Sequence, residues 1–216
     1  LFISPIHFFL IDRIFERVLS NEFLNLTDKF FVYEKMTAIK ITVVGDHLVG
    51  KSCLIYTFLC RSYPKIFPPI VLDGTYDIII QCDNMPVKHI IYDTRGTDDY
   101  KELRPYSYPN TDIFIICFSL QSRKSLDNVK KIWVSEIKNH YPDVPYILVG
   151  TKYDLKDNQI SSEKVDEIPV LSIEGEEMKN ECSSLANYNV DEVFYSAIRI
   201  VLRKMSNKSK SHCSLC

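Results

Sequence analysis

The segment Gly45–Ser52 has the composition and spacing of a loop that binds phosphate groups. It fits the pattern G-x-x-x-x-G-K-[ST], and it lies between a short apolar run and a stretch that opens a helix. Glycines allow the backbone to curl so that its N–H groups point at phosphate oxygens, and the helix N-terminus adds a positive partial charge. Lys51 can reach the β- and γ-phosphates, and the Ser52 hydroxyl suits Mg²⁺. The residues expected to contact the nucleotide here are Asp46, His47, Leu48, Val49, Gly50, Lys51, Ser52 and Cys53.

A second polar segment, Asp93-Thr94-Arg95-Gly96, follows another apolar run. A carboxylate at the end of a strand would hold magnesium through water. Gly96 can offer its N–H to a γ-phosphate at close range because it has no side chain in the way. Taken alone, Asp93 is equally typical of a turn at a strand end. Beside a phosphate loop, we interpret Asp93 and Ser52 as the residues that hold the metal.

A third polar segment, Thr151-Lys152-Tyr153-Asp154, predicts selection of guanine. A buried Asp154 carboxylate can accept from the ring N–H and the exocyclic amine of guanine, whereas adenine lacks this pair of donors. Asp154 therefore argues against the alternative of an ATP-dependent enzyme. The Lys152 stem can lie along the base, and Glu181–Leu185 forms a second wall. The residues expected at the base are Thr151, Lys152, Asp154, Leu155, Ser183, Ser184 and Leu185.

Short apolar runs alternate with helical stretches from Met36 onward, which predicts a three-layer α/β/α fold of the P-loop NTPase type. The second and third runs are joined by a turn at Asp83–Pro86, so these two strands must be antiparallel. Ligands bind at the carboxyl ends of strands in such sheets, and each polar segment above follows a strand. The expected strands are Ile39–Gly45, Tyr76–Cys82, Val87–Asp93, Asp112–Ser119 and Tyr146–Gly150. The expected helices open near Lys51 and cover Ser125–Lys138 and Val190–Met205.

The sheet expected from these runs is mostly parallel, with one antiparallel strand.

The bulk composition is that of one ordinary globular domain with two extensions. The 216 residues are 46% hydrophobic and 25% charged, and the net charge of −2 gives no general attraction to nucleic acid. Seven cysteines, an odd number without a paired-ligand pattern, favour the reducing cytosol. We divide the chain into an N-terminal extension of uncertain status (1–35), a nucleotide-binding domain (36–205) and a flexible basic tail (206–216).

From Met36 to Cys216 the chain resembles the small GTPases of the Ras superfamily, and within it the Rho family, closest to Rac. Besides the three polar segments, the resemblance rests on Leu103-Arg104-Pro105 and Tyr108-Pro109-x-Thr111-Asp112. Thr151 in place of asparagine and the charged stretch Ile160–Glu167 are similar to the Rho branch. The resemblance implies a signalling switch that binds GTP or GDP with Mg²⁺. It also implies effector proteins, exchange factors, activating proteins and dissociation inhibitors as partners.

The resemblance further implies two switch segments. Tyr63 would pack on the base at the start of the first switch, and the second switch would cover Thr94–Arg104. The effector region would include Phe67, Ile70, Val71, Leu72, Asp73 and Tyr76. Pathways of the family concern the cytoskeleton, polarity and motility.

The chain departs from the family where the γ-phosphate would lie. His47 stands in place of glycine, Ile70 in place of the threonine that binds magnesium, and Thr97 in place of the glutamine that orients the attacking water. Arg95 replaces a small residue and could act as an arginine finger in cis, which is the minority interpretation. We expect slow hydrolysis by a catalytic set of Lys51, Arg95, Gly96 and Thr97. The alternative is a GTPase-deficient module that stays GTP-bound and binds effectors.

A second departure lies between Glu174 and Glu181, where Met178 is the only apolar residue. The resemblance implies a helix and then a buried sixth strand in this part of the chain. A helix and a crossover need about ten or more residues, and that room is missing. We therefore expect a mostly parallel six-stranded sheet with one antiparallel strand, in which the sixth strand is shortened or lost, and a looser base pocket.

The last residues, Cys213-Ser214-Leu215-Cys216, have the form C-a-a-X, which predicts prenylation of Cys213. Basic residues before it would supply the second signal that membrane binding needs. We expect the protein in the cytoplasm and on the cytoplasmic face of membranes, the plasma membrane first. Apolar residues between Ile11 and Leu19 have helical spacing, which we interpret as an appended helix, with a membrane-surface helix as the alternative.

Overall fold

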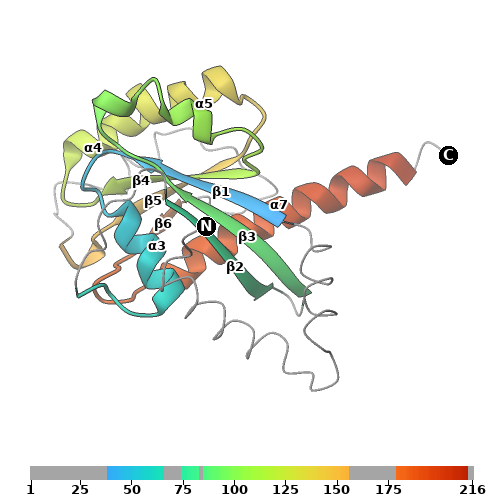
Figure 1. Cartoon of the computed structure of the whole chain (residues 1–216), viewed down its shortest axis with the longest axis horizontal. Helices are drawn as coiled ribbons and strands as arrows, with labels where there is room; N and C mark the ends of the chain where they lie inside the picture. Colours follow the sequence, from blue (N-terminus) through green and yellow to red (C-terminus); the bar gives the residue numbers. More distant parts are fainter. Residues whose placement is uncertain (1–37, 66–73, 83–84, 156–178, 214–216) are drawn as a thin grey trace, which may run out of the picture.

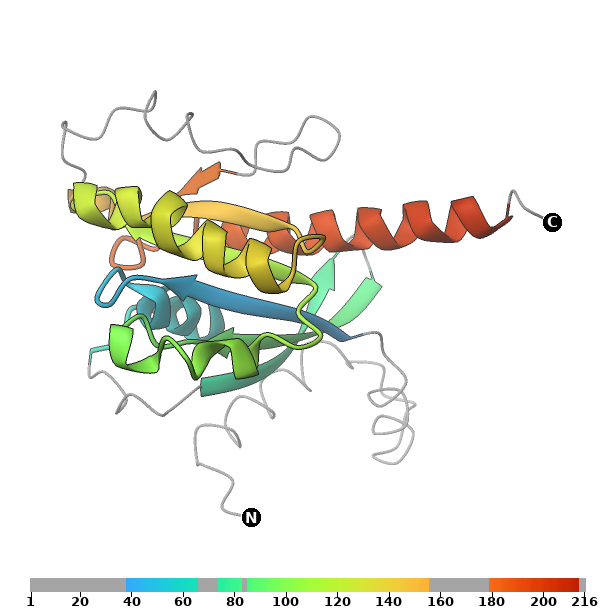
Figure 2. The same ribbon diagram turned by 90° about the horizontal axis from the view of Figure 1, so that it is seen from above.

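The structure is a computed structural model, which describes residues 38–65, 74–82, 85–155 and 179–213. A six-stranded sheet runs through the domain in the order β2-β3-β1-β4-β5-β6, with helices on both of its faces (Figures 1 and 2). The strands are β1 (Ala38–Gly45), β2 (Gly74–Cys82), β3 (Met85–Asp93), β4 (Ile113–Ser119), β5 (Tyr146–Thr151) and β6 (Lys179–Glu181). The longer helices are α3 (Lys51–Cys60), α4 (Arg123–Asn128), the π-helical η3 (Val129–Val134), α5 (Ser135–His140) and α7 (Val190–Cys213). Three short 3₁₀ helices are η1 (Asp98–Tyr100), η2 (Arg104–Ser107) and η4 (Tyr153–Leu155).

The strand directions confirm the expected sheet. β1 is parallel to both β3 and β4, and β5 is parallel to β4 and β6. β2 and β3 are antiparallel, with Cys82 opposite Met85. The turn is shorter than expected, because Met85 and Pro86 belong to β3. β4 is buried at every position, as a central strand covered on both faces should be.

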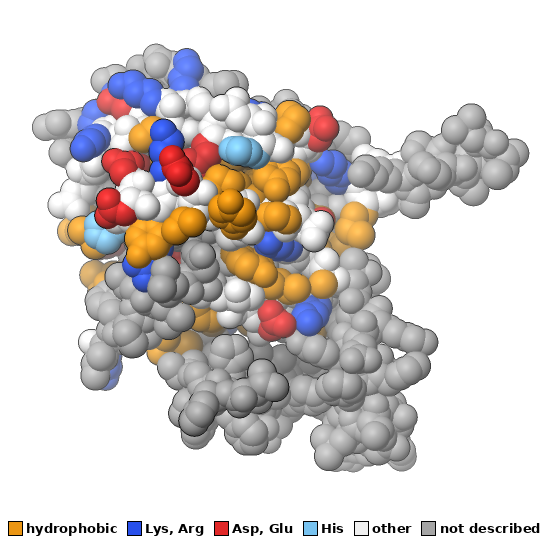
Figure 3. All heavy atoms as spheres, turned by 45° about the horizontal axis from the view of Figure 1, so that its top comes forward, with side chains coloured by type: hydrophobic (Ala, Val, Ile, Leu, Met, Phe, Trp, Pro, Cys, Tyr) orange, Lys and Arg blue, Asp and Glu red, His pale blue; other side chains and the backbone are white. Residues whose placement is uncertain are grey.

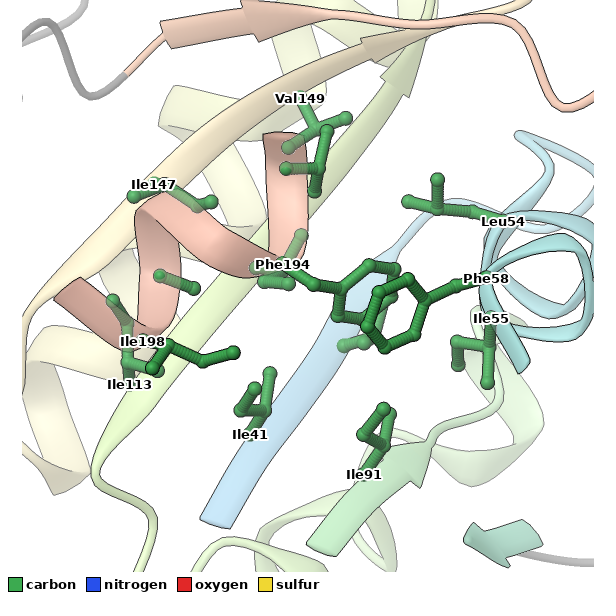
Figure 4. Packing of buried hydrophobic residues seen from close by; sticks show 14 of the residues in the cluster. Ile41, Leu54, Ile55, Phe58, Ile91, Ile113, Ile147, Val149, Phe194 and Ile198 are labelled. Carbon is green, nitrogen blue, oxygen red and sulfur yellow. The ribbon is translucent and has the colours of Figure 1, made fainter. Parts of the chain in front are cut away.

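Two hydrophobic clusters cover the two faces of the sheet. On one face α3 and α7 pack on the strands, and the rings of Phe58 and Phe194 stack with centroids 3.9 Å apart (Figure 4). On the other face the helical run α4–η3–α5 covers the sheet and buries Trp133 near Phe114 and Tyr108. Each large buried side chain contributes about 1.5–3 kcal/mol, so both layers stabilise the strand ends where the ligand segments lie.

The sixth strand is present but short, as β6 spans only Lys179–Glu181 and pairs with Leu148–Gly150 of β5. The expected shortening is confirmed, and complete loss of the strand is wrong. The stretch Ile160–Glu167 lies outside the described residues.

Two helices differ from the expected bounds. The helix expected over Ser125–Lys138 is the continuous run α4–η3–α5, and the Ser122 side chain caps it by accepting from the Ser125 N–H. α7 continues to Cys213 instead of ending at Met205, so the expectation of a flexible tail from residue 206 is wrong up to residue 213. No glycine or proline interrupts the chain there, so nothing local ends the helix. Within the described part of the chain, no helix has the length and apolar character needed to cross a bilayer.

Hydrophobic side chains gather on one face of the molecule (Figure 3). Tyr106 on η2 is 81% exposed and lines two hollows of about 670 Å³ and 610 Å³. Glu136 and Ile132 line the larger hollow, and Tyr92 and Lys40 line the smaller one. Described residues of the phosphate loop line neither of them, so these hollows are separate from the nucleotide site described next.

Candidate nucleotide-binding site

The phosphate loop joins β1 to α3, and its shape depends on two glycines. Gly45 and Gly50 have φ of 141° and 102°, which L side chains rarely adopt. A Cβ on Gly45 would lie 2.2 Å from the carbonyl oxygen of Cys117, so β4 leaves no room for a side chain. Gly50 is the N-cap of α3 and has no side chain to cap it, which leaves the first N–H groups of the helix available to an anion.

Lys51 is the first residue of α3, and its side chain contacts the backbone of the loop. Its side chain is buried, and its Nζ donates to the carbonyl oxygens of Gly45 and Asp46, each at 2.8 Å. Burial lowers the pKa of Lys51 from its ordinary value, and the charge of the nearby Asp93 opposes this effect. An ammonium held this way meets phosphate oxygens without having to reorganise, which is what phosphate binding requires.

The two residues expected to hold magnesium lie on adjacent elements. Ser52 is an exposed residue in the first turn of α3, and Asp93 ends β3 opposite Val43. Among the described residues no group of three or more His, Cys, Asp or Glu side chains could hold a metal alone. A hydroxyl and one carboxylate fit Mg²⁺, which commonly keeps several waters and takes its other ligands from the phosphates.

Gly96 lies directly against the phosphate loop. A Cβ there would come within 2.2 Å of the Gly45 carbonyl oxygen and 2.6 Å of the His47 nitrogen, so only glycine fits. The structure thus brings Gly96 directly to the phosphate loop. Arg95 beside it lies over the ring of Tyr100, with its guanidinium carbon 4.6 Å from the ring centroid.

The two segments expected to bind the base are joined to one another by hydrogen bonds. The Ser183 hydroxyl donates to Asp154 Oδ1 and accepts from the Ala186 N–H at 3.0 Å. The Tyr153 N–H donates to the Cys182 carbonyl oxygen at 3.0 Å, which ties the two loops at the backbone. Asp154 is exposed in the structure, so the expectation of a buried carboxylate is wrong. It lies on η4 at the carboxyl end of β5, where a ligand can approach from outside.

Thr151 connects the base site to the phosphate loop. Its buried hydroxyl lies within hydrogen-bond distance of the carbonyl oxygens of Val49 and Phe118, the latter at 2.9 Å. Tyr63 is half-buried, and burial together with the nearby Cys53 and Asp154 raises its pKa. Tyr63 therefore lies near enough to Asp154 to feel its charge, on the side of the site where the base is expected.

The remaining expected residues are only partly placed. His47 and Leu48 are exposed on the loop, and Leu48 has a left-handed φ of 61°. Tyr76 is half-buried on β2. Cys213 lies in the last turn of α7. Phe67, Ile70, Val71, Leu72 and Asp73 lie outside the described residues.

The partners that hold this site from behind were not predicted from the sequence. Both carboxylate oxygens of Asp46 accept hydrogen bonds at 2.7 Å, one from Asn128 Nδ2 and one from Trp133 Nε1. Arg104 forms an ion pair with Glu136 that is almost wholly buried. The available signals were the motif Leu103-Arg104-Pro105 and the presence of a single tryptophan in 216 residues.

A comparison with protein families gives a match for residues 40–203, to the model described as the Ras family. The matched region covers well over half of the chain. It includes the phosphate loop, the segment Asp93–Thr97 and both segments expected to bind the base.

Proposed function

Because the chain belongs to the Ras family, we propose that it is a Rho-type, Rac-like switch that binds GTP or GDP with Mg²⁺ and hydrolyses GTP slowly. Family membership gives the general part of this function, namely a small GTPase switch with regulators and effectors. The Rac-like identity, the slow hydrolysis and the membrane anchor are the specific parts of the proposal.

The observation that carries the nucleotide assignment is the placement of Asp154. The Ser183 hydroxyl holds one of its oxygens, and Tyr63 lies beside it. The carboxylate thus lies fixed at the end of β5, in the same sheet edge as Lys51 and the phosphate loop. A fixed carboxylate that accepts from two donors of guanine discriminates against adenine, because adenine leaves it unpaired.

Slow hydrolysis is supported by the residues around the loop. Thr97 is too short to orient water as a glutamine would, and exposed His47 adds bulk where an incoming arginine would need room. Arg95 is held on Tyr100 by stacking and by a hydrogen bond of 3.2 Å to the Tyr100 hydroxyl. Phosphoryl transfer depends on positioning and charge stabilisation, so each missing group lowers the rate.

The Rac-like identity is supported by the Arg104 and Thr151 segments named above. Membrane attachment is supported by the C-a-a-X form at Cys213 and by the basic residues of α7, which include Arg199, Arg203 and Lys204. In this proposal the protein acts in the cytoplasm and on the cytoplasmic face of the plasma membrane, in signalling to the cytoskeleton, polarity or motility.

The test is to identify the nucleotide that copurifies with the full chain and then to follow its hydrolysis over hours. We expect GDP or GTP, competition by excess GTP but not ATP, and a rate at or below roughly 10⁻⁴ s⁻¹. GTP that persists for days would favour the GTPase-deficient effector-binding module. Displacement of labelled GDP by ATP would refute guanine selection.

A further inference from the structure

The buried side chain of Trp133 meets the phosphate loop from behind. Trp133 on η3 is 2% exposed, and its Nε1 donates to Asp46 Oδ1 at 2.7 Å. Asn128 on the same helical run donates to the other carboxylate oxygen, also at 2.7 Å. The backbone carbonyl of Asp46 accepts from Lys51. The helical run therefore holds the part of the loop that positions the phosphate-binding lysine.

Arg104 lies over the ring of Trp133, with its guanidinium carbon 4.6 Å from the ring centroid. Its Nη1 donates to the carbonyl oxygens of Arg95 and Thr97, at 3.3 Å and 2.9 Å. These two carbonyls belong to the residues on either side of Gly96. Arg104 thus holds the backbone around the residue whose N–H is expected to meet the γ-phosphate.

The guanidinium itself is fixed by a buried carboxylate. Arg104 Nη2 and Nε donate to the two oxygens of Glu136 at 2.9 Å and 3.3 Å, and Tyr108 donates to Oε1 at 2.6 Å. The exposed fractions of the Arg104 and Glu136 side chains are 2% and 10%. Buried pairs of this kind contribute little net stability compared with an apolar pair, and their use lies more in fixing geometry.

Gly96 is in contact with the loop that Trp133 holds, since a Cβ on it would lie 2.5 Å from the carbonyl carbon of Asp46. Trp133 therefore fixes the phosphate loop, and Arg104, which stacks on Trp133, fixes the backbone around Gly96. The two fixed segments are in contact. We propose that Trp133 and Arg104 are positioning residues that together set the distance between the phosphate loop and Gly96. If the chain binds GTP as proposed, this pair couples the γ-phosphate to the second switch.

The two residues should differ in how they affect the two nucleotides. Arg104 acts on Gly96, which only a nucleotide with a γ-phosphate would contact. Weakening the hydrogen bonds of Arg104 should therefore speed release of GTP and leave release of GDP nearly unchanged. Trp133 acts on Asp46 and through it on the loop, which binds both nucleotides. A merely structural Arg104 would change the binding of GTP and GDP alike, and a merely structural Trp133 would change the two release rates independently of Arg104.

The test measures dissociation of fluorescent GDP and of a fluorescent, non-hydrolysable GTP analogue from the full chain with Mg²⁺. We expect Arg104→Lys to speed release of the analogue about tenfold and of GDP less than about twofold, the loss of charge-assisted hydrogen bonds being of this size. Trp133→Phe keeps the stacking surface but loses the N–H, and should speed release of both about tenfold. In the double variant the acceleration of analogue release should be smaller than the product of the two single accelerations, because the pair acts as one unit.

The matched control is Arg123→Lys, which changes an exposed arginine paired with Asp127 on the same helical run and should alter neither rate. Tyr108→Phe removes one hydrogen bond to Glu136 and keeps Arg104. Tyr108→Phe should speed release of the GTP analogue about threefold and leave release of GDP nearly unchanged. It replaces Arg104→Lys as the test if Arg104→Lys does not unfold cooperatively. Equal acceleration of GDP and analogue by Arg104→Lys or Tyr108→Phe would overturn the inference. A wild-type chain that retains neither ligand would instead overturn the proposed function.

Discussion

The guanidinium of Arg95 lies over the ring of Tyr100, 4.6 Å from its centroid, and Nη1 donates to the Tyr100 hydroxyl at 3.2 Å. This contact holds the residue for which a role as an arginine finger in cis was considered. A cation over an aromatic ring gains about 0.5–2 kcal/mol, and reaching a phosphate would cost Arg95 that contact. The arrangement favours a structural role for Arg95 within the second switch.

We therefore predict that Arg95→Ala changes single-turnover GTP hydrolysis by less than about threefold, since a group held on Tyr100 does not stabilise the transition state. Thr97→Gln should raise the rate, because glutamine can orient the attacking water. Single-turnover assays on the two variants and the wild type provide the measurement. A fast wild-type rate that collapses in Arg95→Ala would show that Arg95 acts as a finger in cis.

Guanine selection should depend on Asp154. Asp154→Asn replaces an acceptor by a donor opposite the ring N–H, so GTP affinity should fall by about 10²-fold or more while xanthine nucleotide binds better. Ser183→Ala, which frees one carboxylate oxygen without removing the charge, is the milder companion and should cost about tenfold. Competition against labelled GDP gives both affinities. Unchanged GTP affinity in Asp154→Asn would mean that the base is recognised elsewhere.

Membrane association is predicted to require Cys213. Cys213→Ser removes the thiol that would carry a prenyl group, so the protein should move to the soluble fraction on cell fractionation. Replacing Lys208 and Lys210 by glutamine should loosen it partly, at about 1 kcal/mol per charge near an anionic surface. Cys182→Ser, at a buried cysteine, controls for loss of a thiol as such. Persistence of Cys213→Ser on membranes would point to the N-terminal segment as the anchor.

The strand ends could be predicted from the sequence because local patterns determine them. Apolar runs ended where polar ligand segments began, and glycines marked the loop at Gly45 and Gly50. Contacts between distant parts of the chain could not be predicted. Asp46 and Trp133 are 87 residues apart in the sequence, so no local pattern predicts the hydrogen bond between them. Arg104 and Glu136 are both charged residues that a sequence pattern places on the surface, and only tertiary packing shows that they are buried together.

The end of α7 shows the opposite error. A polar, basic composition was interpreted as a tail, although lysine and serine without glycine or proline are compatible with a helix that has already begun. Asp154 was interpreted as a buried carboxylate at a position just after the apolar run Tyr146–Gly150. In the structure η4 leaves the Asp154 side chain exposed, so a bound base would itself have to cover the carboxylate.

His89 provides a prediction on stability that is independent of the nucleotide. It lies in the middle of β3, fully buried, between Ile39 of β1 and Ile78 of β2. Neither ring nitrogen has a hydrogen-bond partner among the described residues. Burial lowers the pKa of His89 from 6.5 to about 4, because the charged form would have to be desolvated.

The sign of the pH effect follows from this lowered pKa. Below pH 6.5 the unfolded chain takes up a proton on His89, while the folded chain stays neutral until about pH 4. The unfolded state binds more protons in this window, so the contribution of His89 to the free energy of unfolding falls as the pH drops, by about 3 kcal/mol in all. His89→Leu should remove that slope and raise stability at pH 7 by about 1 kcal/mol, since an unpaired buried polar group is lost. Urea unfolding of both chains between pH 7 and pH 4.5 measures the difference, with the exposed His140→Gln as control. Parallel pH profiles for wild type and His89→Leu would mean that His89 gains a partner or water in solution.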